Sequence, residues 1–248
     1  MIENSFINQN HKKMKNLLKN VVILLSLTSA VLLLGSCSSD EETTVPESTT
    51  TEKAGMETED LTFCCNSDSL PFETLSQAEI DALLLMREEE LLARDVYSAL
   101  YVVYHVPVFN NISKSEQQHS NAILRLLTKY NLEDPALNHQ PGVFVNQDLQ
   151  MLYTSLVAQG EVSRIEAYRV GATIEDLDIK DLMDLMETAD NQDIRLVFAN
   201  LTKGSRNHIR SFSRLMLLSG VTYVPQFISP ELYAWIISTP HERGCING

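Results

Sequence analysis

The stretch that decides the fold is Arg87-Glu88-Glu89-Glu90-Leu91-Leu92-Ala93-Arg94-Asp95-Val96-Tyr97, and Ser115-Glu116-Gln117-Gln118-His119 follows it a short way downstream. The first segment is made of helix-forming residues and sets carboxylates beside Leu, Val and Ala. In the second segment, Glu116 and His119 are three positions apart, so both project from the same side of a helix. Carboxylates and imidazoles on an inward helix face cost free energy unless they are paired, hydrogen-bonded or bound to a metal. The two segments therefore indicate a metal site inside a helical bundle.

The composition favours an all-α fold and argues against several classes of function. The 248 residues include only nine Gly and eight Pro, and long runs of Leu, Ala, Glu and Met favour helices. A formal net charge of −14 excludes nucleic acid as an expected partner, because phosphate binding needs a basic face. A hydrolase is not indicated either, since the sequence has neither a Gly-x-Ser-x-Gly elbow nor a phosphate-binding Gly-rich loop.

The N-terminal segment has the pattern of an export signal. Lysines at positions 12 to 19 precede an apolar run over 21–34, which ends in Leu34-Gly35-Ser36-Cys37. This ending resembles the bacterial lipobox, which implies a lipoprotein signal peptide over residues 1–36 and lipidation of Cys37. A membrane partner, held through this lipid in the bacterial outer membrane, follows from that prediction. The acidic tract over 38–42 resembles the one that sends some lipoproteins to the cell surface.

The remaining chain divides by composition into a tether, a domain and a tail. Residues 37–71 are mostly polar and acidic, which predicts a disordered tether. The folded domain is expected over 72–240, with a short tail over 241–248. In an exported protein Cys64 or Cys65 could form a disulfide with Cys245; free thiols are the alternative.

The first predicted helix begins at the capping box Ser76-Gln77-Ala78-Glu79 and ends near Tyr104, before Pro107. At roughly 100° per residue, one face collects an apolar stripe, which consists of Leu85, Leu92, Val96, Ala99 and Val103. Glu88 falls inside this stripe and is expected to face inward, with Glu89 as the alternative ligand and Asp95 near the edge of the stripe. Arg87, Glu90 and Arg94 are expected to face solvent.

The second predicted helix runs from about Asn110 to Tyr130. Its buried stripe combines apolar and polar residues, namely Ile112, Glu116, His119, Ile123 and Leu126. An alternative is that Ser113-x-x-Glu116 is a capping box, which would leave Glu116 at the entrance of the helix. A short helix is then expected from Asn146 to Gln159, closed by Gly160.

The third and fourth long helices add further polar groups. The capping box Ser163-x-x-Glu166 predicts a helix to about Glu187, on which either Glu175 or Asp178 could reach inward; the spacing does not choose between them. The last long helix spans about 191–220 and carries His208 on its inner face. Gly204 and Ser205, one turn earlier, either permit close helix packing or leave room for something bound.

This arrangement resembles the ferritin-like di-metal carboxylate proteins, whose inward Glu and Glu-x-x-His residues bind two iron or manganese ions. More closely, four segments in order resemble the ferritin-like domain-of-unknown-function family numbered 2202, namely Met86 to Tyr97, Ser115 to His119, Gly171 to Ile179 and Gly204 to His208. The resemblance covers roughly residues 72–240 and implies a ferritin-like four-helix bundle, but no established activity. The chain has Ser205-x-x-His208 where the ferritin-like pattern expects Glu-x-x-His, so Asp178 or Glu175 would have to complete the ligand set. With fewer carboxylates, the site could be mononuclear, asymmetric, occupied by zinc or empty.

Two functions follow as hypotheses. The first is a lipid-anchored metal-binding protein with iron or manganese, an oxidoreductase of ferroxidase or peroxidase type acting on oxygen or peroxide. Its predicted ligands are Glu88, Glu116, His119, Glu175, Asp178 and His208. The second is a metal-free bundle that serves as a surface binding or structural lipoprotein, in which Arg87, Arg94 or Arg206 neutralises the acids. The sequence leaves open whether the chain forms a homodimer.

Overall fold

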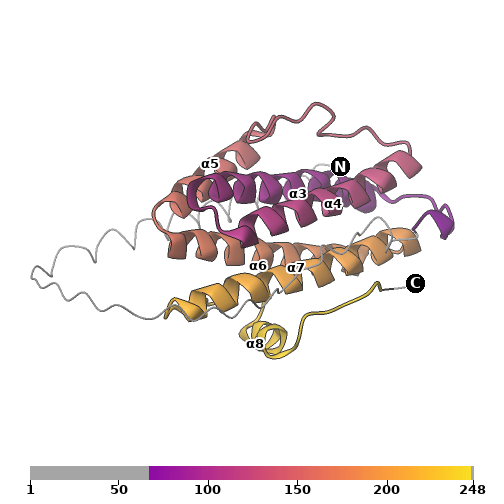
Figure 1. The fold of residues 1–248 in the computed structure, drawn as a ribbon. Coiled ribbons are helices and arrows are strands. Elements are labelled where there is room, and N and C mark those ends of the chain that lie inside the picture. Colours follow the sequence, from indigo (N-terminus) through magenta and orange to yellow (C-terminus); the bar gives the residue numbers. More distant parts are fainter. Residues whose placement is uncertain (1–66, 247–248) are drawn as a thin grey trace, which may run out of the picture.

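The computed structural model describes residues 67–246, which fold into helices joined by loops (Figure 1). A 3-10 turn, η1 (Ser67–Ser69), precedes the α-helices, which are α3 (Gln77–Tyr104), α4 (Pro107–Lys129), α5 (Gln147–Glu161), α6 (Arg164–Thr188), α7 (Gln192–Leu218) and α8 (Pro230–Ser238). Within 67–246 the β pairing amounts to an isolated bridge between Gln140 and Val143. The predicted all-α class is confirmed.

Four long helices form the body of the molecule. The chain makes two antiparallel hairpins, α3 with α4 and α6 with α7, and contacts of α4 with α7 and of α3 with α6 close the bundle (Figure 1). A long crossover runs back along the bundle between the hairpins and ends in α5, which packs on α3 and α6. The face of the bundle between α3 and α6 is therefore covered by α5.

A polar layer divides the interior into two apolar clusters. One cluster includes Tyr97, Phe109 and Phe212, and the other includes Met86 and Phe198. On α3, α4 and α7, the segments that contribute to the two clusters are separated by buried polar residues, namely Glu90, Glu116, His119 and His208. On α6, Glu175 groups with Glu116 and His208, and Asp178 contacts Ser205 of α7. These six residues form the polar layer.

The helix boundaries confirm most of the predicted signals and correct two of them. Ser76 and Glu79 form the predicted capping box of α3, and the Ser163 hydroxyl accepts a hydrogen bond from the backbone N–H of Glu166. However, α4 begins at Pro107, because proline lacks the N–H that a first helical turn leaves unpaired. Glu116 thus lies in the third turn of α4, and the alternative of a capping box at Ser113 was wrong.

Gly160 was predicted to follow its helix, but it lies inside α5. A Cβ at this position would stand 2.5 Å from Cδ2 of Leu100 on α3. The absence of a side chain therefore lets α5 approach α3 closely. This contact positions the covering helix on the bundle.

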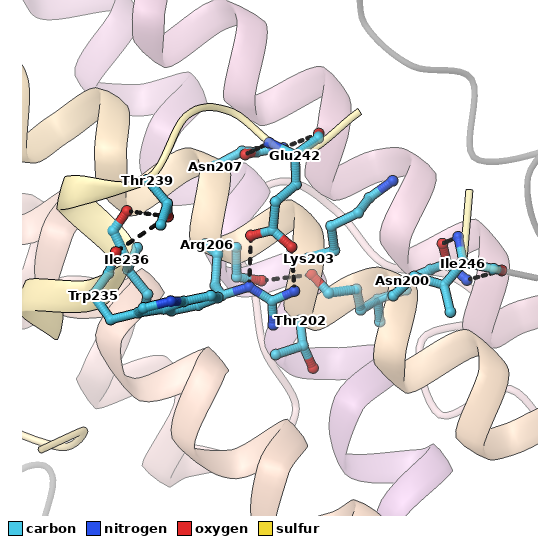
Figure 2. Close-up of polar contacts among 12 residues, drawn as sticks. Asn200, Thr202, Lys203, Arg206, Asn207, Trp235, Ile236, Thr239, Glu242 and Ile246 are labelled. Carbon is cyan, nitrogen blue, oxygen red and sulfur yellow. Dashed lines mark hydrogen bonds and ion pairs between the residues drawn. The ribbon is translucent and has the colours of Figure 1, made fainter. Parts of the chain in front are cut away.

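The C-terminal tail lies along the outside of α7 (Figure 2). Arg206 forms two hydrogen bonds to the carboxylate of Glu242, with Nε donating to Oε1 at 2.7 Å and Nη2 donating to Oε2 at 2.5 Å. Further along, Lys203 donates to the carbonyl of Gly244, and Asn200 both donates to and accepts from the backbone of Ile246. The tail is therefore held by a row of polar side chains on one stripe of α7.

Several predictions concern residues outside the described range. The signal peptide, the lipidation of Cys37 and most of the tether fall outside residues 67–246. Cys245, within this range, is in a disulfide, while Cys64 and Cys65, predicted as its possible partners, lie outside the described residues. Among the described helices, none combines the length and the apolar character needed to cross a bilayer.

Candidate metal centre

Two groups of buried acids and histidines meet in the polar layer. The first consists of Glu90, Glu116 and His119, and the second of Glu116, Glu175 and His208. In each group the potential ligand atoms all lie within 4.8 Å of one another. Glu116 belongs to both, so α3, α4, α6 and α7 all contribute to one continuous site.

Glu116 contacts one histidine with each of its carboxylate oxygens. Its Oε2 lies 2.7 Å from Nδ1 of His119, and its Oε1 lies 2.9 Å from Nδ1 of His208. Each Nδ1 also lies near a second carboxylate, at 3.2 Å from Oε2 of Glu90 for His119 and at 3.3 Å from Oε2 of Glu175 for His208. The two imidazole rings stack with their centroids 5.4 Å apart. This is the arrangement of a carboxylate that bridges two three-residue groups.

The residue of α3 in the two groups is Glu90, which was predicted to face solvent. Glu90 is only 2 % exposed, whereas Glu88 and Glu89 are half-buried and belong to neither group. Burial and the charge of Asp134, a residue of the crossover, raise the pKa of Glu88. Arg87, also expected in solvent, is buried because it pairs with Asp134 at 3.0 Å. The inward stripe of α3 is the one that passes through Leu83, Met86, Glu90, Ala93, Tyr97 and Leu100.

Of the two acids that the sequence left as alternatives on α6, Glu175 belongs to one of the two groups and Asp178 belongs to neither. Glu175 is in the second group, and its Oε1 accepts a hydrogen bond of 2.5 Å from the hydroxyl of Tyr97. Asp178 is partly exposed as a residue, but its carboxylate is held by the hydroxyl of Ser205. Burial and the charges of Glu90 and Glu175 raise the pKa of Asp178 well above its ordinary value. The hydroxyl of Ser205, the residue predicted to stand in place of a ligating Glu, thus contacts a carboxylate from α6.

Neighbouring residues fix the two histidines differently. Nε2 of His208 lies 3.0 Å from the hydroxyl of Ser115, which leaves Nδ1 facing the carboxylates. His119 packs against Gly204, where a Cβ would stand 2.5 Å from Nε2 of His119. Of the two roles predicted for Gly204, close packing is therefore the one observed, and the group packed against it is an imidazole.

The pKa values follow from burial and from the alternation of acids and histidines. Burial raises the pKa of Glu90 to about 8 and that of Glu175 to about 7. Burial alone would also raise the pKa of Glu116, but the charges of His208 and His119 hold it well below its ordinary value. Burial opposes protonation of His208, yet Glu116 and Glu175 raise its pKa to about 9. Without another cation, protons on the histidines and on the acids with raised pKa values therefore compensate the buried negative charge.

The donor set fits divalent transition metals. Within residues 67–246, four buried side-chain nitrogen or oxygen atoms lack a hydrogen-bond partner, and three of these are Oε1 of Glu90, Oε1 of Glu116 and Nε2 of His119. Oε1 of Glu116 is close to His208, but not in hydrogen-bond geometry. Carboxylate and imidazole ligands suit iron, manganese and zinc. Unpaired carboxylate oxygens in a buried acidic site are where such an ion would bind.

The arginines considered as neutralising partners contact other groups. Arg87 pairs with Asp134, Arg94 with Asp95 at 2.6 Å, and Arg206 with Glu242 at 2.5 Å. For the residues described, the ion pairs of Glu116 are with His119 and His208. The metal-free hypothesis thus loses the arginines on which it depended, and in the described part of the chain the ion pairs of Glu90, Glu116 and Glu175 are with the histidines.

Comparison with known proteins identifies relatives over the whole helical domain. Residues 79–240 match the family described as uncharacterized protein domain DUF2202. The uncharacterized protein MJ0754 of Methanocaldococcus jannaschii is 50 % identical over 176 residues, which cover 71 % of this chain and 95 % of that protein. The crystal structure of hypothetical protein MJ0754 from Methanococcus jannaschii DSM 2661 superposes with a TM-score of 0.69 at 49 % identity, covering 70 % of this chain and 99 % of that one. The chain therefore belongs to the DUF2202 family.

Proposed function

We propose that this protein is a ferritin-like metal-binding protein that holds two ions of iron or manganese in its polar layer. The observation that carries the proposal is the pair of buried three-residue groups that share Glu116 and contain carboxylate oxygens without hydrogen-bond partners. An antiparallel pair of helical hairpins joined by a long crossover, with acids and histidines facing inward, is also the ferritin-like arrangement.

Each residue of the layer has a definite role in this proposal. Glu116 would bridge the two ions, Glu90 and His119 would hold one, and Glu175 and His208 the other. Asp178, held by Ser205, would replace the carboxylate that α7 lacks. Tyr97 donates to Oε1 of Glu175, which leaves Oε2 facing His208.

The proposed activity is oxidation chemistry with oxygen or peroxide, as in a ferroxidase or peroxidase. Two bound redox-active ions would supply the electrons for reducing either molecule. The chain supplies the ligands, a dry interior on both sides of the layer, and histidines that can release protons when an ion binds. Binding of metal is then expected to be tighter at higher pH.

The cellular location is a separate proposal that rests on the N-terminal sequence. We propose that Cys37 carries a lipid that anchors the domain in the bacterial outer membrane, at the cell surface if the acidic tract after it acts as a sorting signal. The support is the order of a basic segment, an apolar run and Leu34-Gly35-Ser36-Cys37. Labelling cells with a radioactive fatty acid tests it, with Cys37→Ser as the control that should lose the label.

Metal analysis of the purified helical domain tests the main proposal. We expect about two equivalents of iron or manganese per chain, and a loss of both in Glu116→Gln because this side chain is common to the two groups. Glu88→Gln is the matched control, since it removes a half-buried acid of α3 that belongs to neither group. The proposal fails if the wild-type protein, supplied with these metals without oxygen, retains only trace amounts. It also fails if the two variants lose metal equally.

A metal-free bundle with a structural or surface-binding role remains the second candidate, and one observation favours it. Protonated His119 and His208 can form ion pairs with Glu116, Glu90 and Glu175 without any metal ion. If this is the working state, removal of metal by a chelator should leave the unfolding temperature unchanged. Under the leading proposal, loaded protein should unfold at a higher temperature than stripped protein.

A further inference from the structure

A cavity of about 40 Å³ opens from the polar layer towards α5. One wall is acidic and consists of Glu90, Glu116, Glu175 and Asp178, with Glu89 nearby. The opposite wall is the inward stripe of α5, which consists of Leu149, Leu152 and Leu156. The cavity therefore lies between the proposed metal ligands and a helix that supplies no ligand.

The leucine wall is an inner surface and offers no polar group. Leu149, Leu152 and Leu156 are at most 4 % exposed, and their spacing of three and four residues puts them on one face of α5. Thr173 also lines the cavity, but its hydroxyl already accepts a hydrogen bond from the side-chain amide of Gln226. A charged or strongly hydrated molecule would lose its water at this wall without gaining a partner from it.

The size of the cavity limits what can enter. One water molecule needs roughly 10–15 Å³ by this measure, so the space admits about three water-sized groups. Cavities with apolar walls such as the leucine wall bind small apolar molecules, including xenon. Negatively charged molecules are further disfavoured by the acidic wall.

We propose that this cavity is a binding site for a neutral, apolar molecule of a few heavy atoms, of the size of dioxygen. Helix α5 forms the apolar wall of this site. The binding itself needs no metal. Its use as the place where such a molecule meets the metal ions rests on the proposed function, and it favours oxygen over peroxide, which is polar and forms hydrogen bonds. Helix α5 would then form part of the ligand site in addition to packing on the bundle.

Xenon binding to the metal-free helical domain tests the site directly. We expect a saturable xenon-induced shift in the NMR signals of methyl groups on α5, and a loss of affinity of about tenfold or more in Leu152→Trp, because the larger side chain fills the cavity. Met151→Trp is the matched control: Met151 neighbours Leu152 but is 50 % exposed, so its replacement should leave xenon binding unchanged. Should Leu152→Trp fail to fold, Ala93→Leu fills the same cavity from α3.

The outcomes separate this inference from the proposed function. No saturable shift in the wild-type protein overturns the cavity proposal, and so does equal binding by wild type and a folded, cavity-filled variant. If xenon binds but the protein holds no metal, the cavity stands and the metal proposal fails. If both hold, Leu152→Trp should keep its iron content and lower the rate at which dioxygen oxidises the ferrous protein, whereas Met151→Trp should change neither.

Discussion

Two adjacent acids of α6 face opposite environments, although both are buried. Asp176 is 0 % exposed and Glu175 is 1 % exposed. Oδ2 of Asp176 accepts hydrogen bonds from the Tyr223 hydroxyl at 2.8 Å and from the backbone N–H groups of Gln226 and Phe227, and Oδ1 accepts one from the N–H of Ile228 at 2.9 Å. This carboxylate is saturated with donors. It holds the segment after α7 against the bundle.

Glu175 and its neighbours in the polar layer have far fewer donors. Glu175 accepts a hydrogen bond from one hydroxyl and shares one imidazole nitrogen with Glu116. One oxygen of Glu90 and one of Glu116 have no hydrogen-bond partner. An unsatisfied buried polar atom costs about 1–3 kcal/mol. The Asp176 site shows that this chain can satisfy a buried carboxylate with its own hydrogen-bond donors. The contrast therefore separates a structural carboxylate from carboxylates that are arranged for an external partner.

The largest effect on stability that this contrast predicts is at Asp176. Asp176→Asn replaces one acceptor oxygen by an amide group that faces N–H donors, so we expect a loss of about 3 kcal/mol in the free energy of unfolding, measured with urea. Metal content should not change in the fraction that folds. In the metal-free protein, Glu175→Gln should cost less than about 1 kcal/mol, because few donors depend on its charge. Equal losses of unfolding free energy in the two variants would show that Asp176 and Glu175 do not differ in their structural role.

The next effect is at Gly204, where the space for an imidazole is limited. In Gly204→Ala the new Cβ would stand 2.5 Å from Nε2 of His119, which must move away from Glu116 and Glu90. We expect a loss of about 1–3 kcal/mol in stability and a clear loss of metal affinity by titration calorimetry.

Gly171→Ala provides the control for Gly204→Ala. Its Cβ would stand 2.5 Å from the ring of Phe212, which is an apolar contact outside the two groups. We expect a comparable loss of stability with metal affinity retained. A loss of metal affinity in Gly171→Ala as large as that in Gly204→Ala would mean that loosened packing, and not displacement of His119, governs binding.

Much of the fold and part of the site could be predicted from local signals. Ser76 and Ser163 mark helix starts because their hydroxyls accept backbone N–H groups, which is a property of a few neighbouring residues. Glu116, His119 and His208 were predicted to face inward because each lies in an apolar stripe of its own helix. The structure brings all three together.

The choice on α3 could not be made from one helix alone. This helix is apolar on two sides, because it contacts the bundle on one side and α5 on another. The stripe predicted to face inward includes Leu85 and Val103, yet Val103 is 44 % exposed. The stripe through Leu83, Tyr97 and Leu100 passes through Glu90 and is fully buried. Tyr97 was a usable signal that this stripe is buried. The second apolar side of α3 is explained by its packing against α5.

A smaller effect is expected at Ser205, whose hydroxyl holds the carboxylate that replaces the missing Glu. Ser205→Ala should weaken metal binding about tenfold, which is about 1.4 kcal/mol, because Asp178 loses its positioning hydrogen bond. Ser213→Ala is the control on the same helix, since its hydroxyl pairs with Tyr233 at 2.9 Å outside the polar layer. It should lower stability by about 1 kcal/mol and leave metal binding unchanged. If Ser205→Ala binds metal as tightly as the wild type does, Asp178 is not a ligand that depends on Ser205.

The smallest effect is expected at Glu242, an acid that is saturated with donors but lies near the surface. Burial would raise its pKa, but hydrogen bonds and the charge of Arg206 lower it below the ordinary value. A lowered pKa in the folded state means that the stabilisation is complete above about pH 4.5 and is lost as the pH falls through the folded pKa. Glu242→Gln should therefore cost less than about 1 kcal/mol at pH 7 and flatten the decline in stability below about pH 4.5.

Metal binding at neutral pH should be unaffected, because Glu242 contacts the outer stripe of α7 and not the polar layer. A change in metal affinity in this variant would show that the tail and the polar layer are coupled through α7.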